Sequence, residues 1–339
     1  MNGHGGYNTK KNDQLMASLK RLLMAAFHAV VTCATNPTLL NKTGPTVYIL
    51  GLTGIFGWGV RVAIPYVYQS YAAWICRCFQ SLGCFLAFEL MINWIGIVLV
   101  DSSYRVATKP LHEMSAEDNQ NSYLSIHNSY GQEAGPHSAT DTVLRRRYFT
   151  WNYCFRCNLM SPPRAHHCPI CNRCILKRDH HCYVAARCIG FRNFRYFAVF
   201  IFYAVLATLF SLVHALPYAH YEVIPKVPNY LDILYPITLV RYCLGYVNLN
   251  EMILILLGWI LLFYLIASLI TFQNVYRSIV SGLTIFEIRS TLNVRDNRSI
   301  SGKLGAVFGQ YWWLNFLVPL HQIYPPIDDP LSWPTLSVS

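Results

Sequence analysis

The fold of this chain is constrained most by four long apolar segments, each close to the roughly twenty residues that an α-helix needs to cross a bilayer. Only 13% of the 339 residues are charged, whereas a typical soluble domain has about 25%. These features predict a mainly α, multipass membrane protein with four transmembrane helices. We expect the helices at residues 46–68, 82–100, 194–216 and 252–272.

The distribution of basic residues predicts how these helices are oriented. Segments 1–45, 101–195 and 273–339 contain five, thirteen and five Lys and Arg residues, while segments 69–81 and 217–251 contain one and two. Basic residues are enriched in cytoplasmic loops, so we expect both termini and the central segment in the cytosol. The formal net charge of +11 then reflects contact with anionic membrane lipid, and no nucleic-acid partner is expected.

The chain divides into six expected parts. Within the first, residues 15–35 are interpreted as an amphipathic helix on the membrane surface, with a fifth span as the alternative. Asn41, Lys42 and Thr43 form a glycosylation sequon, which this topology leaves unmodified in the cytosol. The parts are a cytosolic N-terminal segment (1–45), helices one and two (46–100), a partly disordered cytosolic loop (101–150), a cysteine-rich domain (151–193), helices three and four with a luminal loop (194–272) and a cytosolic C-terminal segment (273–339).

Two polar residues, Glu89 and Asn93, lie one turn apart inside the second expected helix. An ionisable residue inside a membrane span is costly and is usually paired. We expect a buried, hydrogen-bonded pair that faces the other helices. A proton or ion pathway is the alternative, and it would place the chain among the transporters or channels.

The cysteines are concentrated in one short region. Seven of the twelve lie between Cys154 and Cys188, together with four histidines. C-x2-C spacing lets a tight turn direct two thiolates to one tetrahedral zinc, and this dense pattern is typical of metal binding in a reducing compartment rather than of disulfides. Two closed zinc sites need eight ligands, and the cluster offers eleven residues. Three are therefore left over, and spacing alone does not say which.

One group in the cluster has the composition of an activated thiol. In the run Asp179, His180 and Cys182, the carboxylate can orient the imidazole and the imidazole can activate the thiol. A ubiquitin ligase of the RING type would close its second zinc site with a final C-x2-C pair. Here five residues separate Cys182 from Cys188, which argues against that class.

The stretch 154–197 resembles the Asp-His-His-Cys (DHHC) cysteine-rich domain of protein palmitoyltransferases. The four-helix arrangement, with this domain after the second span, agrees with that resemblance. It implies a small cytosolic zinc-binding catalytic domain, which we expect to consist of short β-hairpins and loops. The matching residues are the C-x2-C pairs, Pro162-Pro163-Arg164, His167-Cys168, Asp179-His180-His181-Cys182, Cys188, Asn193 and Phe197.

The resemblance also implies which residues hold the two structural Zn²⁺ ions and which carry out catalysis. Cys182, His180 and Asp179 are left as the catalytic set. His166 is not assigned to either group, and we expect it at the surface or next to the site residues. One zinc falls on Cys154, Cys157, His167 and Cys174, and the other on Cys168, Cys171, His181 and Cys188.

The function implied by this resemblance is protein S-acylation. Cys182 would take a fatty acyl group, palmitoyl above all, from acyl-CoA and pass it to cysteines of membrane-associated substrate proteins. Endoplasmic reticulum or Golgi membranes are the implied location.

Three departures from the family pattern lie around these residues. Residues 183–187 read Tyr-Val-Ala-Ala-Arg in place of Pro-Trp-Val-Asn-Asn, Ile285 replaces the second Thr of a Thr-Thr-x-Glu motif, and Lys303 stands at a usual Asn. The first departure supports the alternative of a catalytically silent, membrane-anchored zinc scaffold that recruits protein partners.

Overall fold

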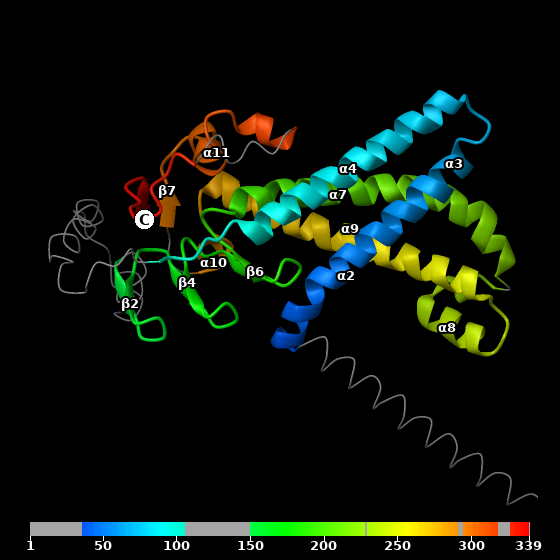
Figure 1. Cartoon of the computed structure of the whole chain (residues 1–339), viewed down its shortest axis with the longest axis horizontal. Coiled ribbons are helices and arrows are strands. Elements are labelled where there is room, and N and C mark those ends of the chain that lie inside the picture. Colours follow the sequence, from blue (N-terminus) through cyan, green and yellow to red (C-terminus); the bar gives the residue numbers. More distant parts are fainter. Residues whose placement is uncertain (1–35, 106–149, 228, 291–293, 318–325, 339) are drawn as a thin grey trace, which may run out of the picture.

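The computed structural model describes residues 36–105, 150–227, 229–290, 294–317 and 326–338. Within these residues, four helices are long and apolar enough to cross a membrane. They form an elongated bundle, with small β-hairpins at one end and a short helix, α8 (Tyr235–Cys243), at the other (Figure 1). The prediction of a mainly α, multipass membrane protein is confirmed. The expected amphipathic helix 15–35 and most of the loop 101–150 lie outside the described residues.

The first span consists of α2 (Pro37–Trp58), a π-helical turn (Gly59–Ala63) and α3 (Ile64–Val67). It begins at Pro37 rather than at residue 46 because Asn36 caps the helix. The Asn36 side chain accepts hydrogen bonds from the backbone N–H groups of Thr38 and Leu39, and proline is well suited to the first helical position. Pro45 lies inside the helix, although a proline there cannot donate the usual backbone hydrogen bond.

The other three spans also differ in length from the sequence prediction. Helix α4 covers Ala73–Leu99, and α7 covers Phe194–Tyr218 before continuing as short π and 3₁₀ turns to Lys226. Helix α9 runs through Leu249–Ser281 and ends nine residues beyond the predicted residue 272. Gly282 ends it with a φ of 76°, a left-handed conformation that glycine adopts without steric cost. The expected luminal loop contains a 3₁₀ turn (Tyr230–Ile233) and α8 (Tyr235–Cys243).

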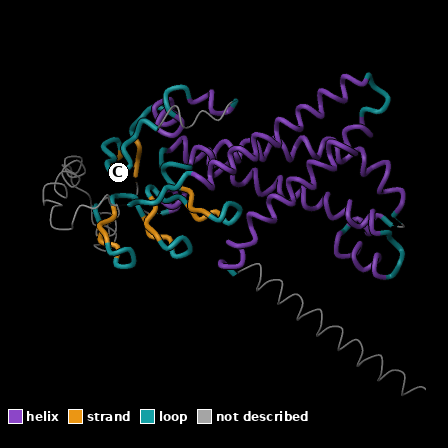
Figure 2. The backbone as a smooth tube through the Cα atoms, in the orientation of Figure 1, coloured by secondary structure: helices purple, strands orange, loops and turns teal. Residues whose placement is uncertain are grey.

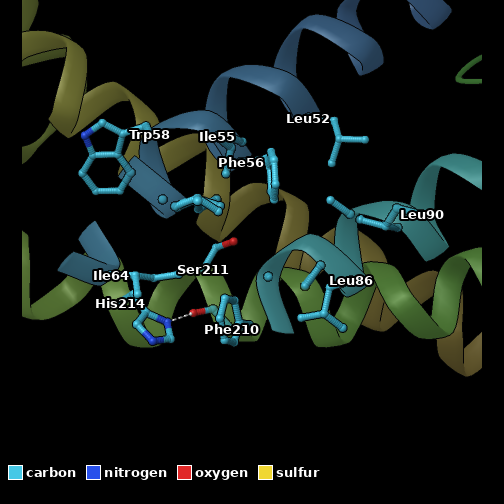
Figure 3. A pocket seen from close by; sticks show the side chains of 16 residues that line it. Leu52, Ile55, Phe56, Trp58, Ile64, Leu86, Leu90, Phe210, Ser211 and His214 are labelled. Atoms are coloured by element: carbon cyan, nitrogen blue, oxygen red, sulfur yellow. Dashed lines mark hydrogen bonds between the residues drawn. The ribbon is translucent and has the colours of Figure 1, made fainter. Parts of the chain in front are cut away.

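Helix α7 lies at the centre of the bundle and packs against α4 and α9. Its buried residues, among them Phe197 and Val199, form the main apolar core together with Leu86 and Ile97 of α4. Between α2, α4 and α7 lies an apolar pocket that is partly open to the outside, drawn from close by in Figure 3. An apolar interior with an unfilled space leaves room for an apolar ligand among the helices.

The polar pair of the second span is buried as expected. Glu89 and Asn93 are 1% and 0% exposed, and the Asn93 side-chain amide donates to the Glu89 carboxylate at 3.1 Å. The structure confirms a hydrogen-bonded pair inside the bundle, so the pair needs no ion pathway to explain it.

Three two-stranded antiparallel hairpins form the cysteine-rich region, and the orange strands of Figure 2 show them at one end of the bundle. The prediction of short hairpins is confirmed. The hairpins pair β1 (Asn152–Cys154) with β2 (Leu159–Ser161), β3 (His166–Cys168) with β4 (Arg173–Ile175), and β5 (His180–Cys182) with β6 (Arg187–Ile189).

The C-terminal segment returns to the hairpin end of the bundle (Figure 1). Helix α10 (Ile285–Arg289) starts with a capping box formed by Thr284 and Glu287. Strand β7 (Val294–Asp296) pairs with β8 (Leu336–Val338). Between them, α11 (Ile300–Phe308) and a 3₁₀ turn (Trp312–Phe316) pack on the bundle.

Candidate active site and metal centres

The three hairpins repeat one frame of fourteen residues. In each hairpin the first strand ends at a cysteine, Cys154, Cys168 or Cys182, and that cysteine pairs with the residue five positions later. The repeat is visible in the sequence as a cysteine at every fourteenth position, 154, 168 and 182. It matters because equal spacing places equivalent side chains at equivalent positions of each hairpin.

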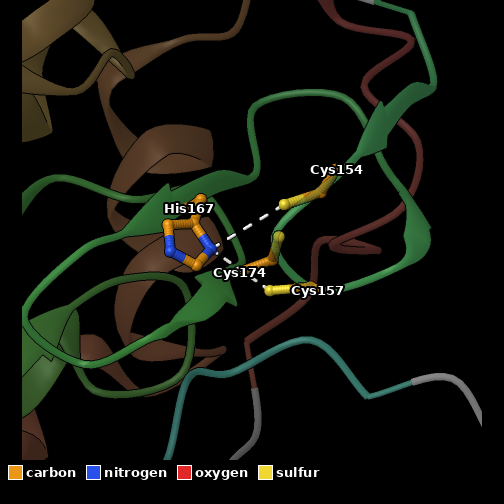
Figure 4. A group of neighbouring side chains, drawn as sticks. All are labelled: Cys154, Cys157, His167 and Cys174. Carbon is orange, nitrogen blue, oxygen red and sulfur yellow. Dashed lines mark hydrogen bonds between the residues drawn. The ribbon is translucent and has the colours of Figure 1, made fainter.

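The first metal centre takes its ligands from two successive hairpins. Cys154 and Cys157 come from the first, and His167 and Cys174 from the second, with all four ligand atoms within 4.8 Å of one another. Figure 4 shows the His167 ring directed at the sulfur atoms. Its Nδ1 lies 3.7 Å from Cys154 Sγ and 3.1 Å from Cys157 Sγ.

The second centre repeats this arrangement one hairpin later. Cys168 and Cys171 of the second hairpin meet His181 and Cys188 of the third. His181 Nδ1 lies 3.3–3.7 Å from the three sulfur atoms, and the Sγ atoms of Cys171 and Cys188 are 3.6 Å apart. The structure thus brings the eight predicted ligands together in the two predicted groups of four.

These distances fit tetrahedral zinc. Bond lengths of about 2.3 Å to sulfur and about 2.0–2.1 Å to nitrogen imply sulfur–sulfur separations of about 3.8 Å and sulfur–nitrogen separations of about 3.6 Å. The observed separations between 3.1 and 3.7 Å lie near these values. Three thiolates and one imidazole are also the donors that structural zinc prefers, so both groups could hold zinc.

The repeat explains why Cys182 is left out of both groups. Each centre combines the C-x2-C pair of one hairpin with the His and Cys of the next. In the third hairpin the pair positions are Cys182 and Ala185. No further hairpin can complete a third centre there, because α7 begins at Phe194. Cys182 therefore lies outside both candidate metal sites, in the last of the three hairpins.

The Cys182 thiol lies beside an oriented imidazole. Asp179 Oδ2 is 2.8 Å from His180 Nδ1, and Asp179 Oδ1 accepts a hydrogen bond of 2.9 Å from the backbone N–H of Ile285. Burial disfavours the charged ring of His180, but its hydrogen bonds with Asp179 and Cys182 outweigh this effect and raise its pKa to about 9. The arrangement favours an imidazolium beside the thiol, which places an acid–base group next to a candidate nucleophile.

An apolar pocket, partly open to the outside, lies next to the turn that follows Cys182. Val184 lines it next to Tyr48 of α2, Phe200 of α7 and Tyr264 of α9. The pocket in Figure 3 lies next to it, because Ala207 and several other residues line both spaces. Together they form an apolar interior that extends from the thiol region into the bundle.

Other residues of the expected motif join the hairpins to the helices. Asn193 accepts hydrogen bonds from Ser102 Oγ and the Gly190 N–H, and its amide donates to the carbonyl oxygens of Ile97 and Cys188. His166, which had no assigned role, packs its ring on Phe286 of α10. Burial lowers the pKa of His166 to about 4, so its ring is neutral and belongs to the packing of the domain.

Two contacts at the site come from membrane helices that the motif does not include. The Asn41 Oδ1 atom of α2 lies 2.8 Å from His181 Nε2. The Trp94 indole of α4 donates to the Val184 carbonyl at 3.1 Å. In the sequence, Asn41 is recognisable only as a polar residue shortly before the first apolar segment. Nothing local indicated its partner, because the contact joins residues 140 positions apart.

Comparison with known proteins identifies the domain. The family model described as DHHC palmitoyltransferase matches residues 147–291. Similar curated proteins are palmitoyltransferase ZDHHC20 of Homo sapiens (46% identical over 69 residues; 20% of this chain and 19% of the relative), palmitoyltransferase ZDHHC2 of Homo sapiens (28% over 183 residues; 51% and 47%) and a protein named as a ZDHHC-type palmitoyltransferase in Dictyostelium discoideum (33% over 141 residues; 41% and 36%). The chain thus aligns with less than half the length of each relative. Residues 147–291 form a domain of the DHHC palmitoyltransferase family.

Proposed function

We propose that this protein is a protein S-acyltransferase that moves a fatty acyl group, palmitoyl above all, from acyl-CoA through Cys182 to cysteines of membrane-associated proteins. The observation that carries the proposal is the arrangement of Asp179, His180 and Cys182 two residues from an apolar pocket. The printed names of the similar proteins support the same class of reaction.

The first step forms an acyl-enzyme. The Cys182 thiolate attacks the carbonyl carbon of the acyl-CoA thioester, the carbon–sulfur bond to CoA breaks, and His180 gives its proton to the leaving CoA thiolate. Asp179 holds the imidazole in place through its Nδ1 atom. The acyl chain lies in the apolar pocket that Val184 lines, where its burial from water stabilises the complex.

The second step transfers the acyl group to a substrate protein. A substrate thiol gives its proton to neutral His180 and attacks the acyl carbonyl carbon, and the bond to Cys182 breaks. Because each step replaces one thioester with another, the reaction needs orientation and an activated thiol rather than a large driving force.

The metal centres have a structural role in this proposal. Zinc at the two closed Cys₃His groups leaves no open position for water or substrate. The groups instead fix the second and third hairpins to each other, since His181 and Cys188 lie on either side of the turn that follows Cys182. The metal-bound array holds the thiol at the end of the helical bundle.

The proposal includes a topology. Acyl-CoA and reduced thiols are cytosolic, so the catalytic domain (151–193) and both termini face the cytosol at an endoplasmic reticulum or Golgi membrane. The spans are Pro37–Val67, Ala73–Leu99, Phe194–Lys226 and Leu249–Ser281. A protease-sensitive tag placed within residues 113–141 tests it. In sealed vesicles that expose their cytosolic face, the tag should be cleaved from outside, and its protection would contradict the topology and the mechanism together.

The decisive experiment is a measurement of acylation and zinc on the same purified protein. The wild type should carry hydroxylamine-sensitive lipid on Cys182 and two equivalents of zinc. Cys182→Ser should lose the lipid and keep both zinc ions, because Cys182 belongs to neither ligand group. Loss of zinc in this variant would show Cys182 to be a ligand.

A silent scaffold is the alternative, and its support is the changed sequence of residues 183–187 after Cys182. The turn after Cys182 contains Ala186 with a φ of 49°, a strained conformation for alanine. A wild-type protein that holds both zinc ions but takes up no lipid on Cys182 would support the scaffold.

A further inference from the structure

We propose that Asn41 and Gly44 of α2 are positioning residues for the hairpin that carries Cys182, and that they act through His181 and the Tyr183 carbonyl group. The inference rests on the proposed function, because it concerns the placement of the same thiol. It adds a membrane helix to the parts that hold the active site, and neither residue belongs to the cysteine-rich domain.

Asn41 contacts a metal ligand from outside the metal centre. His181 directs Nδ1 at the three sulfur atoms, and its Nε2–H donates to Asn41 Oδ1 at 2.8 Å. This hydrogen bond fixes the tautomer that leaves Nδ1 free to ligate, and it fixes the orientation of the ring. The first centre has no equivalent contact, since His167 Nε2 is buried without a hydrogen-bond partner among the described residues. The two centres thus have the same kinds of ligand, but among the described residues only the second has a hydrogen bond from its histidine to a membrane helix.

Gly44 lies one turn further along the same face of α2 and touches the turn after Cys182. A Cβ atom at this position would lie 2.1 Å from the Tyr183 carbonyl oxygen, which is far inside van der Waals contact. The helix and the turn can therefore approach each other only because residue 44 has no side chain. Any larger residue must push the backbone next to the nucleophile away from α2.

The contact continues along α2 into the apolar pocket. Tyr48 stacks on Trp94 with ring centroids 5.4 Å apart, and Trp94 donates to the Val184 carbonyl. Asn41, Gly44 and Tyr48 are spaced three and four residues apart, which places them on one face of the helix. This face of α2 therefore contacts three parts of the site. They are His181, which precedes Cys182, the turn that follows Cys182, and the wall of the apolar pocket that Val184 lines.

The arrangement has a physical reason in this chain. The turn 183–187 lacks the residues that the family usually has there, and Ala186 adopts a left-handed conformation that costs alanine about 1 kcal/mol or more. A turn with this local strain needs contacts from elsewhere to keep one conformation. Helices α2 and α4 supply those contacts.

The test of Asn41 measures zinc release and needs no acyl transfer. Purified variants in detergent are mixed with excess chelator, and release of the two zinc equivalents is followed over time. Asn41→Ala should speed the release of one equivalent about 10- to 100-fold and leave the other unchanged. Asn41→Asp, which keeps an acceptor for His181, should restore slow release. Thr43→Ala destroys the same glycosylation sequon and should behave as the wild type.

The test of Gly44 compares two glycines of one helix. Gly44→Ala should keep both zinc ions and slow self-acylation of Cys182 at saturating acyl-CoA by about 100-fold, the scale of a misplacement of about 1 Å at a reacting group. Gly54→Ala should change nothing, because no atom lies within 4 Å of a Cβ there. If Gly44→Ala does not fold, Trp94→Phe, which removes the donor to Val184, should give the same slowing.

Unchanged zinc release in Asn41→Ala, or equally fast release in Thr43→Ala, would overturn the role of Asn41. Unchanged self-acylation in both Gly44→Ala and Trp94→Phe would overturn that of Gly44. A wild type without acylation on Cys182 would instead contradict the proposed function, and the zinc-release result would still decide the role of Asn41.

Discussion

Arg164 and Glu287 are 123 residues apart in the chain and form a buried ion pair with two hydrogen bonds of 2.6 Å. Both side chains are 0% exposed. Arg164 follows the first hairpin, and Glu287 lies in α10, where it also accepts the backbone N–H of Thr284. The backbone N–H of Ile285, the residue after Thr284, donates a hydrogen bond to the Asp179 carboxylate. The ion pair therefore fixes the α10 backbone that orients the carboxylate behind His180.

The first prediction concerns the charge of Glu287. Burial opposes ionisation of its carboxyl group, but Arg164 and the Thr284 N–H outweigh burial and hold the pKa of Glu287 below its usual range. A lowered pKa in the folded state gives stability that is fully present above the unfolded pKa of about 4.3 and is lost as pH falls through the lower folded value. Glu287→Gln should therefore destabilise the protein near neutral pH by about 3–5 kcal/mol, the cost of breaking a buried pair.

Thermal unfolding in detergent across pH 3–8 checks this prediction. The difference in Tm between the wild type and Glu287→Gln should be constant at neutral pH and shrink in acid, where the wild-type carboxylate is protonated as well. Glu251→Gln is a matched control outside the pair. A Tm difference that stays the same at every pH would contradict the role of the Glu287 charge.

The second prediction separates two adjacent histidines. His180→Ala should keep both zinc ions and lose most self-acylation, because His180 faces Asp179 and Cys182 and lies outside the ligand groups. His181→Ala should lose one zinc and destabilise the domain, because structural zinc contributes roughly 10–16 kcal/mol of apparent binding energy in small peptide sites. Zinc analysis and lipid labelling of the same samples check both. Equal zinc loss in the two variants would show that the roles are not divided.

The third prediction uses the repeat of the hairpins. Asn158, Asn172 and Ala186 occupy equivalent positions fourteen residues apart, with φ values of 52°, 50° and 49°. Asparagine tolerates this left-handed conformation better than alanine. Ala186→Asn should stabilise the hairpin that carries Cys182 by about 1 kcal/mol, seen as a higher Tm with zinc content unchanged. The reverse change, Asn172→Ala, should lower Tm by a similar amount, and a fall in Tm for Ala186→Asn would contradict the strain at this position.

Much of this molecule follows from sequence pattern. The apolar segments predict the four helices, and C-x2-C spacing predicts metal binding, because both signals are local and strong. Helix ends were less predictable. Asn36 followed by Pro37 is a recognisable N-cap and first residue of a helix. The apolar stretch begins later in the sequence, however, so the first helix was predicted to start at residue 46. The division of ligands between two centres came from the family resemblance, although the fourteen-residue repeat carries the same information.

The contacts that hold the site together could not be predicted in this way. Asn41 and His181 are 140 residues apart, and no local pattern links a residue of the first span to the third hairpin. Lys303 is a similar case. It stands where the family usually has Asn, and its ammonium donates to the Val280 carbonyl in the last turn of α9, where a cation also favours the helix dipole. Such pairings become visible only when the helices are placed in space.

The last prediction concerns the length of the acyl chain. Ala207 of α7 lines both apolar pockets, so a large side chain there should fill space where the two pockets adjoin. Each methylene kept out of the protein loses about 0.8 kcal/mol of burial. Ala207→Phe should therefore lower self-acylation with a sixteen-carbon chain by roughly tenfold for every two methylenes excluded, while chains short enough to end before Ala207 keep the wild-type rate. Rates measured with a series of saturated acyl-CoAs, each below its micelle concentration, give the comparison. Leu206→Phe is the matched control, because Leu206 is the preceding residue of α7, is 38% exposed and lines neither pocket. An equal loss for all chain lengths in Ala207→Phe would mean that the substitution damages the fold, and an equal rate for all of them would mean that the chain does not pass Ala207.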